Sequence, residues 1–511
     1  MLFATLYAFR NLLVPEIPWG LDHTVHMHHA WVMSDHLLPT GSVTGWSHTQ
    51  FAGYPAFTLY APLPYLLIAA LDWLGGTLIS LDVAYLIVVI GGVSFGLAMS
   101  VWVMLVSHGV SRSAALVAGL MLVFARGGYN EGGWEQVYVD GVWPHVLALV
   151  MLVLVITAMG TAVRRPTRLR IGGLALATAA ALLTHPIGFV HLAIAVPCYL
   201  LAFVRSWRGL MPVALGLALG ALLSAFWWLP FLEMSGFVRP QGEAWMSWVE
   251  LGPALWSGSV WTSSLPGMHL AGAITIVACL VAAPRVGAFA RFGLLIVASF
   301  LLLGTSTPWE VLGLDDYRVY LQINFRRFRA VSKIGWTVFA AVGVVMVVRR
   351  FPVRSRPVLS AVVLAAAVGA VWPLAGTLKA EVFDAPHLLQ PMSESPLHAD
   401  IEDAYAALED HIERTGARDY PFRVLIRDIR GIHCNHVLPR RLGVGLAQDS
   451  TRPTFHFWAT FVDERPASLA HNLATRYALT CANPLPSHVS SRLLFQRDHI
   501  ALYELGDYRP V

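Results

Sequence analysis

The sequence predicts an all-α polytopic membrane protein of about 11 transmembrane helices, followed by a C-terminal α+β domain outside the cytoplasm. Of the 511 residues, 56% are hydrophobic and only 13% are charged, whereas a soluble domain carries about 25% charged residues. Long apolar runs fill residues 1–377, but residues 378–511 have an ordinary polar composition. We therefore divide the chain into a membrane domain, 1–377, and a soluble domain, 378–511.

The first apolar run covers residues 1–14. No basic segment precedes it and no small-residue cleavage site follows it, so we expect no cleavable signal peptide. It is shorter than the roughly 20 residues that a helix needs to cross the hydrocarbon core. Either the chain starts upstream or this first helix is short and tilted.

Further apolar runs are spanning candidates because they contain few or no charges over a length close to that of a membrane helix. They are 82–106, 142–162, 171–186, 187–204, 209–232, 265–283, 289–304, 334–348 and 357–377. Two shorter runs are ambiguous: 57–73 contains Pro62 and Pro64, which disrupt helix hydrogen bonding, and 114–126 is short. We favour 114–126 as a span and 57–73 as a helix on the outer surface. The opposite choice gives the same topology downstream.

Basic residues orient the membrane domain. Arginines concentrate in four short segments, 163–170, 205–208, 284–291 and 349–356, which alternate with the other connections between spans and so share one side of the membrane. Cytoplasmic loops carry the excess of Lys and Arg, so these four segments are expected inside. The first loop, 16–80, contains no Lys or Arg. It therefore lies outside, as do 127–141, 233–264, 305–333 and the tail from 378.

The tail reads as an α+β domain. Its predicted strands are 422–426 and a hairpin over 492–505 that turns at Arg497-Asp498, and its predicted helices are 398–414 and 466–476. Cys434 and Cys481 also lie in the tail. A disulfide between them is permitted if the tail is outside the cytoplasm, although spacing alone cannot show that the two are close.

The first outside loop concentrates ionisable residues beside apolar segments. If 22–38 is helical, Asp22, His26 and His29 lie on one face at positions i, i+4 and i+7. One carboxylate and two imidazoles could bind a divalent metal such as Mg²⁺ or Mn²⁺. Asp22 could instead act as a general base, or the segment could be an interfacial helix whose histidines simply face water.

Two other outside loops carry candidate residues. The glycine-rich loop 127–141 contains Glu131, Glu135 and Asp140, which could supply a second acid or a metal ligand, or could belong to a flexible polar connection. The loop 305–333 contains the run Phe325-Arg326-Arg327-Phe328-Arg329. These basic residues lie on the side that the positive-inside rule disfavours.

Arginine forks bind phosphate oxygens bidentately. Arg326, Arg327 and Arg329 therefore suit the phosphate of a lipid carrier in the outer leaflet. The alternative is that they pair with anionic lipid or with Asp315 and Asp316.

At Asp22, Phe51-Ala-Gly-Tyr-Pro55 and Tyr60-Ala-Pro-Leu-Pro-Tyr65 the sequence resembles the GT-C superfamily of membrane glycosyltransferases. Within it, the sequence is most similar to bacterial and archaeal membrane proteins labelled 6-pyruvoyl-tetrahydropterin synthase-related, a label that does not imply pterin chemistry. The resemblance covers roughly residues 1–380, and the order of the features matches although no single motif is diagnostic. Supporting features are Val142-Trp143-Pro144, His185-Pro186, Ala225-Phe-Trp-Trp-Leu-Pro230 and the Phe-Arg-Arg-Phe run.

The resemblance implies a catalytic Asp in the first outside loop, at the position of Asp22, and surface-lying helices after it. It also implies an inverting hexosyl- or pentosyltransferase of the plasma membrane that takes a sugar from a polyprenyl-phosphate carrier. The acceptor would be a lipid, a glycan or a protein of the cell envelope, recognised by the soluble tail. The sequence has Asp22-His23 where the superfamily often has two acids one residue apart, which puts metal dependence in doubt.

Two other functions fit the composition. A transporter or flippase for a lipid-linked or polar solute would place its binding residues at the bilayer midplane, within inverted repeats. Here the charged groups sit at the outer edge and no repeat is evident. A non-catalytic assembly protein would depend on its tail and dispense with Asp22 and the arginine run.

Overall fold

The structure is a computed structural model, and it describes residues 1–49, 53–128, 130–237, 246–257, 287–317, 320, 322–338, 389–394, 397–417, 422–428, 445–448, 475–481, 485, 489–498 and 500–506. These residues form two compact units. We call Met1–Leu13, Ile87–Trp228 and Pro240–Leu389 the helix unit. Val14–Leu86, Leu229–Arg239 and Gln390–Val511 form the loop–tail unit.

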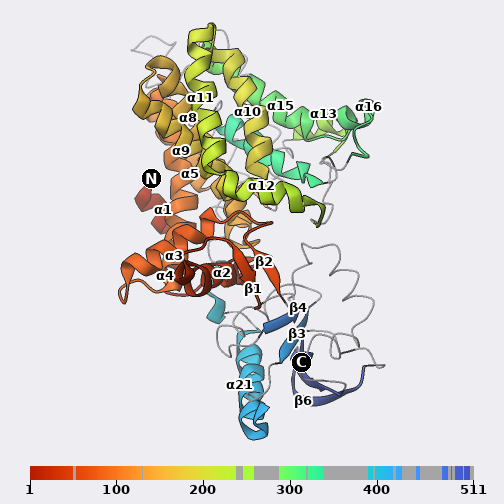
Figure 1. Cartoon of the computed structure of the whole chain (residues 1–511). Helices are drawn as coiled ribbons and strands as arrows, with labels where there is room; N and C mark the ends of the chain where they lie inside the picture. Colours follow the sequence, from red (N-terminus) through yellow and green to blue (C-terminus); the bar gives the residue numbers. More distant parts are fainter. Residues whose placement is uncertain are drawn as a thin grey trace, which may run out of the picture. The chain divides into compact units, whose positions relative to one another are not determined.

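The helix unit is a bundle of apolar helices (Figure 1). In chain order they are α1 (Leu2–Ala8), η1 (Arg10–Leu12), η4 (Ile87–Phe95), α5 (Gly96–Ser107), α6 (Arg112–Val123), α7 (Trp134–Tyr138), α8 (Trp143–Arg164), α9 (Arg168–Thr184), α10 (Ile187–Phe203), α11 (Trp207–Leu223), α13 (Trp248–Ser257), α15 (Ala288–Leu303), α16 (Thr307–Val311) and η6 (Phe325–Arg327). A further helical stretch covers 328–338. Helix α8 contacts α5, α9 and α10, and 15 of its 22 residues are buried, so it forms the centre of the unit.

Two continuous helices in the described part of the chain are long and apolar enough to cross a membrane, Leu81–Ser107 and Trp143–Arg164. They match the predicted spans 82–106 and 142–162. Helices α9, α10 and α15 coincide with three further predicted spans but contain 16 or 17 residues each. The predicted spans 265–283 and 357–377, and most of 334–348, lie outside the described residues, so the total of about 11 spans stays a prediction.

The predicted span 209–232 is not one straight helix. Helix α11 ends at Leu223 and α12 (Ala225–Met234) continues at an angle of 70° to it. Ser224 stands at the break, and its hydroxyl donates to the carbonyl of Gly220, four residues earlier. Such a bond competes with the backbone ladder and bends helices.

The two ambiguous runs both form short helices. Residues 63–75 form α3 (Leu63–Gly75), 13 residues long, and α6 has 12 residues. Pro62 caps α3 and Pro64 lies in its first turn, where no intrahelical N–H bond is lost. The prolines thus begin the helix instead of breaking it.

The loop part of the loop–tail unit begins with α2 (His23–Trp31), which continues as the π-helical turn η2 (Val32–Leu37) and then η3 (Leu38–Thr40). This confirms the predicted helix over 22–38. A two-stranded antiparallel ribbon follows, made of β1 (Gly45–Ser47) and β2 (Tyr54–Ala56). Helices α3 and α4 (Leu81–Leu86) pack against α2.

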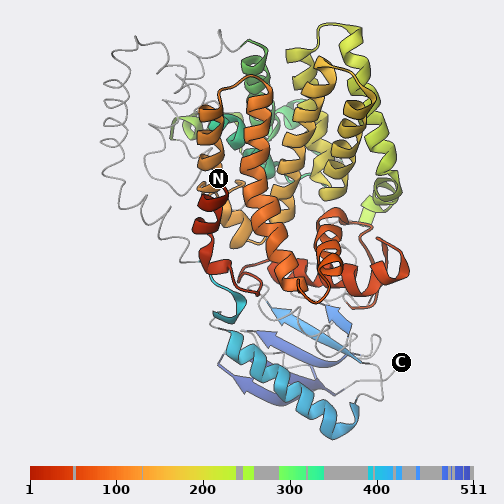
Figure 2. The same cartoon turned by 90° about the vertical axis from the view of Figure 1, so that its left-hand side faces the viewer.

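The tail part is an α+β fold. After η10 (Met392–Glu394), helix α21 (His398–Thr415) packs on β6 and β7 of a five-stranded sheet, as Figure 2 shows in blue. The strands are β3 (Arg423–Asp428), β4 (Gly445–Gln448), β5 (Thr475–Cys481), β6 (Ser491–Arg497) and β7 (Ile500–Leu505), in the order β4-β3-β5-β7-β6. β3 runs parallel to β4 and β5, and β7 runs antiparallel to β5 and β6.

These elements confirm the predicted helix 398–414, the strand 422–426 and the hairpin 492–505. The predicted helix 466–476 is wrong at its end, because Thr475 and Arg476 begin β5; the rest of it lies outside the described residues. Cys434 also lies outside them, so the disulfide with Cys481 stays a prediction.

Candidate functional site

Asp22 lies immediately before α2 in the loop–tail unit. Its carbonyl accepts the N–H of His26 at 3.0 Å, which starts the helix, while its carboxylate does not cap the first turn. The residue is partly exposed. A carboxylate at this position can reach a substrate and still be held by a rigid helix.

The histidines of α2 point into the protein. His23 Nδ1 lies 2.7 Å from the Tyr85 hydroxyl, and His26 Nδ1 lies 2.7 Å from the Tyr65 hydroxyl. A third histidine of α2, His28, places its Nε2 2.9 Å from the Thr49 hydroxyl. The interpretation that these side chains simply face water is therefore wrong for the three buried histidines.

Aromatic rings surround His29, the next histidine along. Its ring centroid lies 5.2 to 6.4 Å from those of Tyr54, Phe57, Tyr60 and Tyr65. Phe57 has φ +59°, a strained backbone that costs about 1–3 kcal/mol and that concentrates at functional sites. Burial, followed by the neighbouring tyrosines, raises the pKa of Tyr65 well above its usual value, so its hydroxyl stays protonated.

The structure does not assemble the expected metal ligands. Among the described residues, no group of three or more His, Cys, Asp and Glu side chains is arranged to hold a metal ion. His26 and His29 are 6.4 Å apart between ring centroids, and Nδ1 of His26 lies 2.7 Å from the Tyr65 hydroxyl. These residues do not fit a metal centre, and no step below passes through one.

The segment before Asp22 is bonded to the start of the tail. The N–H of Trp19 donates to the carbonyl of Gln390 at 2.8 Å, and the N–H of Met392 donates to the carbonyl of Ile17 at 2.9 Å. The Glu16 carboxylate accepts from both the N–H and the hydroxyl of Ser393. Sequence reasoning missed this contact, because nothing in either segment marks it.

The helix unit contains a second polar group, built on the glycine-rich loop 127–133. Glu131 is almost fully buried and accepts an N–H of Arg329 at 2.7 Å and the backbone N–H of Gly128 at 3.2 Å. Gly132 has φ +73°, and a Cβ there would lie 2.7 Å from the Cβ of Ala330. Only glycine lets the loop approach the 328–338 helix this closely.

Lys333 adds a second cation beside Glu131. Burial lowers its pKa to about 8, against the opposing influence of the Glu131 charge. Burial likewise lowers the pKa of Arg329. The Glu131 carboxylate thus provides negative charge beside two buried cations, Arg329 and Lys333.

The remaining candidates of this unit lie around that group. Glu135 accepts from Arg126 at 2.8 Å, and the backbone N–H of Asp140 donates to the Glu135 carbonyl at 3.0 Å. Arg326 is exposed, whereas Arg327 is partly buried with its Nη1 at 2.9 Å from His185 Nε2. The structure therefore joins Arg329 to Glu131, while Asp22 belongs to the other unit.

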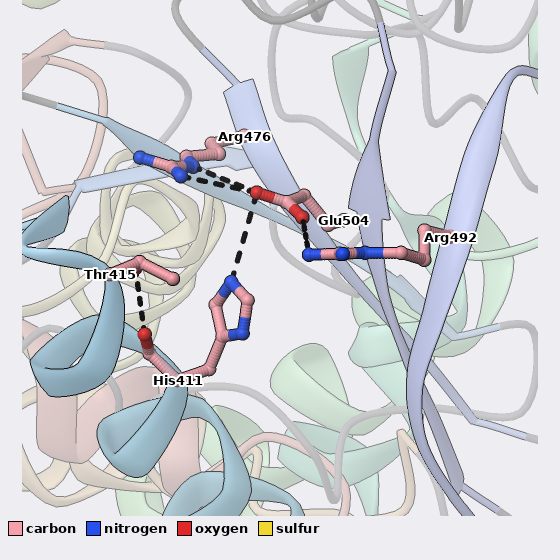
Figure 3. A network of polar contacts seen from close by, with 5 residues as sticks. All are labelled: His411, Thr415, Arg476, Arg492 and Glu504. Atoms are coloured by element: carbon pink, nitrogen blue, oxygen red, sulfur yellow. Dashed lines mark hydrogen bonds and ion pairs between the residues drawn. The ribbon is translucent and has the colours of Figure 1, made fainter.

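The tail contains its own ionic network, drawn in Figure 3. Glu504 on β7 accepts from Arg476 on β5 at 3.1 Å and from Arg492 on β6 at 2.5 Å. His411 of α21 places its Nε2 3.7 Å from the same carboxylate. The network ties the helix to the sheet.

Solved structures share the fold of this chain. The archaeal oligosaccharyltransferase AglB from Archaeoglobus fulgidus, in complex with an inhibitory peptide and a dolichol-phosphate, superposes with a TM-score of 0.54 at 10% identity, covering 94% of this chain and 68% of that one. The same archaeal enzyme in complex with Zn and sulfate gives 0.51 at 11% identity, covering 94% and 67%. The arabinofuranosyltransferase AftD from Mycobacteria gives 0.61 at 14% identity, covering 99% of this chain and 41% of that one.

These neighbours are GT-C glycosyltransferases, and identities this low show likeness of fold alone. No curated protein sequence is significantly similar to this chain. Residues 57–375 match the family described as 6-pyruvoyl-tetrahydropterin synthase related domain, membrane protein. Because the match covers more than half of the 511 residues, the chain belongs to this family of membrane proteins, as its motifs predict.

Proposed function

We propose that this chain is an inverting membrane glycosyltransferase that uses a polyprenyl-phosphate-linked sugar at the outer face of the plasma membrane. The acceptor is a lipid, a glycan or a protein of the cell envelope. The observation that carries the proposal is the position of Asp22, a partly exposed carboxylate at the start of a helix of buried histidines. The GT-C-like fold supports the same reaction class.

Asp22 is the proposed base. It accepts the proton of the acceptor hydroxyl as the hydroxyl oxygen bonds to the anomeric carbon and the bond from that carbon to the phosphate oxygen breaks. Polyprenyl phosphate leaves with the bonding electrons. General base catalysis of this kind contributes about 10²–10⁴-fold.

The arginine run is proposed to stabilise the departing phosphate. Arg326 is exposed and so offers its guanidinium to a ligand, and Arg327 is half-buried behind it. Arg329 is paired with Glu131, and it is the third arginine proposed to contribute positive charge near the phosphate. Positive charge near the developing phosphate lowers the barrier because the negative charge grows in the transition state.

The acids of the 127–141 loop have a different proposed role. Glu131 and Glu135 each bond an arginine, so they position cations. Asp140 is partly exposed and remains the proposed second acid.

The test uses purified protein in nanodiscs with polyprenyl-phosphate sugars, following release of polyprenyl phosphate. Asp22→Asn should lower turnover by about 10²-fold or more, with expression unchanged. Asp35→Asn is the matched control, because Asp35 is an exposed carboxylate on the continuation of the same helix. Full turnover in Asp22→Asn would remove Asp22 from the reaction.

Two further assays test the other two functions. Binding of the carrier without any sugar release, together with movement of the carrier between leaflets, would indicate a flippase. An Asp22→Asn variant that complements a deletion strain, when a truncation of the tail does not, would indicate an assembly protein.

A further inference from the structure

Three histidines of the helix unit lie together with one arginine. We call His145, His185, His191 and Arg327 the histidine cluster. The ring of His145 lies 6.0 Å from that of His185 and 5.8 Å from that of His191, between centroids. His145 and His191 are fully buried and His185 is 7% exposed.

A chain of hydrogen bonds fixes the tautomer of His145. The backbone N–H of Gly132 donates to Gln136 Oε1 at 2.6 Å, so the amide nitrogen of Gln136 is the atom that faces His145 Nδ1 at 2.7 Å. An amide nitrogen only donates. Nδ1 must therefore accept, and the proton of a neutral His145 is on Nε2. That N–H is buried and meets no acceptor among the described residues.

His185 faces donors on both sides. The backbone N–H of Ile187 points at Nδ1 from 3.1 Å, and Arg327 Nη1 lies 2.9 Å from Nε2. A guanidinium only donates, and a neutral imidazole has one acceptor nitrogen. One of these two donors therefore faces an N–H whichever tautomer His185 adopts.

His191 and Arg327 continue the same imbalance. Neither ring nitrogen of His191 has a hydrogen-bond partner within the described part of the chain, and Arg327 Nε is likewise buried without one. His191 lies against the rings of Phe300 and Phe328, at 5.6 and 6.2 Å. Apolar neighbours supply no acceptor.

The nearby carboxylates do not correct the imbalance. Glu131 is bonded to Arg329 and Glu135 to Arg126. Each buried donor without an acceptor costs about 1–3 kcal/mol. A site that collects several of them, with a guanidinium, is poised to receive a group that only accepts.

We propose that the histidine cluster binds an oxyanion, with His145 Nε2–H, His191 and Arg327 donating to the oxygens of a phosphoryl group. A phosphoryl oxygen carries negative charge and accepts several hydrogen bonds at once. The proposal rests on the proposed function in one respect, that a carrier lipid is the natural source of the phosphate. A free phosphate has the same chemistry.

The test measures phosphate binding by the full-length protein in nanodiscs of neutral lipid, with inorganic phosphate and farnesyl phosphate as separate probes. His145→Phe and His191→Phe each remove donors and keep a ring, so either should weaken binding tenfold or more. His108→Phe is the matched control. It is also a histidine of the helix unit, but its Nδ1 lies 2.7 Å from the Met104 carbonyl.

Stability of the unliganded protein separates binding from packing. His191→Phe removes a donor that meets no acceptor, so the melting temperature should stay the same or rise, whereas His108→Phe should lower it. In the wild type, ¹⁵N spectra of labelled histidine should show the His145 Nε2–H resonance move when phosphate is added. This measurement holds even if a variant does not fold.

Each outcome decides the matter. Binding of farnesyl phosphate alone assigns the cluster to a lipid phosphate, and binding of both probes assigns it to a phosphoryl group from either source. No binding of either probe, or binding that neither variant weakens, overturns the proposal.

The proposal and the proposed function can fail separately. Asp22-dependent sugar release that persists in His145→Phe would leave the transferase standing and remove the cluster. Phosphate binding that depends on the cluster, in a protein that releases no sugar, would do the reverse.

Discussion

The ion pair between Glu131 and Arg329 should be the most costly polar contact to break in the helix unit. Its atoms are 2.7 Å apart, and the two side chains are 3% and 15% exposed. The tail offers a matched control, Asp410 and Arg414, also at 2.7 Å but 63% and 68% exposed. Since the distance is the same, the comparison tests the effect of burial and of the groups that surround the buried pair.

The magnitude follows from what each change leaves behind. Glu131→Gln leaves the buried cations Arg329 and Lys333 without the negative charge of Glu131. Removal of one partner of a buried ion pair costs about 3–5 kcal/mol of stability. Arg329→Met should cost less, because Lys333 remains to balance Glu131. Asp410→Asn should cost under about 1 kcal/mol, since an exposed pair at this helical spacing contributes only about 0.3–0.5 kcal/mol.

Reversible unfolding of the detergent-solubilised protein, followed by tryptophan fluorescence, measures all three variants. Adding Lys333→Met to Glu131→Gln should recover part of the lost stability, because it removes one of the uncompensated cations. Equal costs for Glu131→Gln and Asp410→Asn would refute the argument from burial. A cost for Arg329→Met as large as that for Glu131→Gln would refute the role of Lys333.

Two further predictions concern the loop–tail unit. The tail should lose stability as the pH falls: burial lowers the pKa of His411, so its contribution is present above the unfolded value of about 6.5 and is lost below it. Burial alone would raise the pKa of Glu504, but hydrogen bonds from two arginines lower it overall, so the stability that Glu504 contributes is lost at still lower pH. Hydrogen exchange of β5 and β7 between pH 7 and 4 measures the loss from both residues. Protection of these strands that does not fall would contradict the role of the network. Glu16→Ala should open the contact with Ser393 and speed hydrogen exchange over 389–394 about fivefold, for a loss of about 1 kcal/mol of local stability. Asp35→Ala is the control, and unchanged exchange in Glu16→Ala would show that the backbone bonds alone hold the segment.

The helix that follows Asp22 was predictable, but its partners were not. Helical spacing placed Asp22 and His26 on one face, and in the structure Asp22 directly precedes the helix that contains His26. The hydroxyls that bind His26 and His23 come from Tyr65 and Tyr85, which are 39 and 62 residues away in the chain. No periodicity within one helix encodes a contact with another.

The bend at Ser224 shows a second limit. An apolar run predicts a span because apolar side chains favour lipid, and residues 209–232 satisfy that test throughout. At the break the Ser224 hydroxyl donates to the Gly220 carbonyl, and one serine changes the composition of the run hardly at all. Hydropathy averages over a window and so misses it.

The tail shows the limit of short apolar runs. Arg497-Asp498 marked the hairpin correctly because this polar pair separates two segments that contain apolar residues. β5 is a central strand, paired with β3 on one side and β7 on the other, and its apolar side chains do not alternate. Periodicity alone cannot distinguish such a strand from a buried helix.

The pairing of the segment before Asp22 with the start of the tail also fixes when this part of the protein can mature. Glu16 and Ser393 are 377 residues apart in the chain. At about 5–20 residues per second, a ribosome needs about 20–75 s to make the intervening chain. During that interval the loop lacks the strand-like partner that it has in the finished protein. A nascent or truncated chain therefore presents Asp22 without its final support, and maturation of this loop is delayed until the start of the tail has been synthesised.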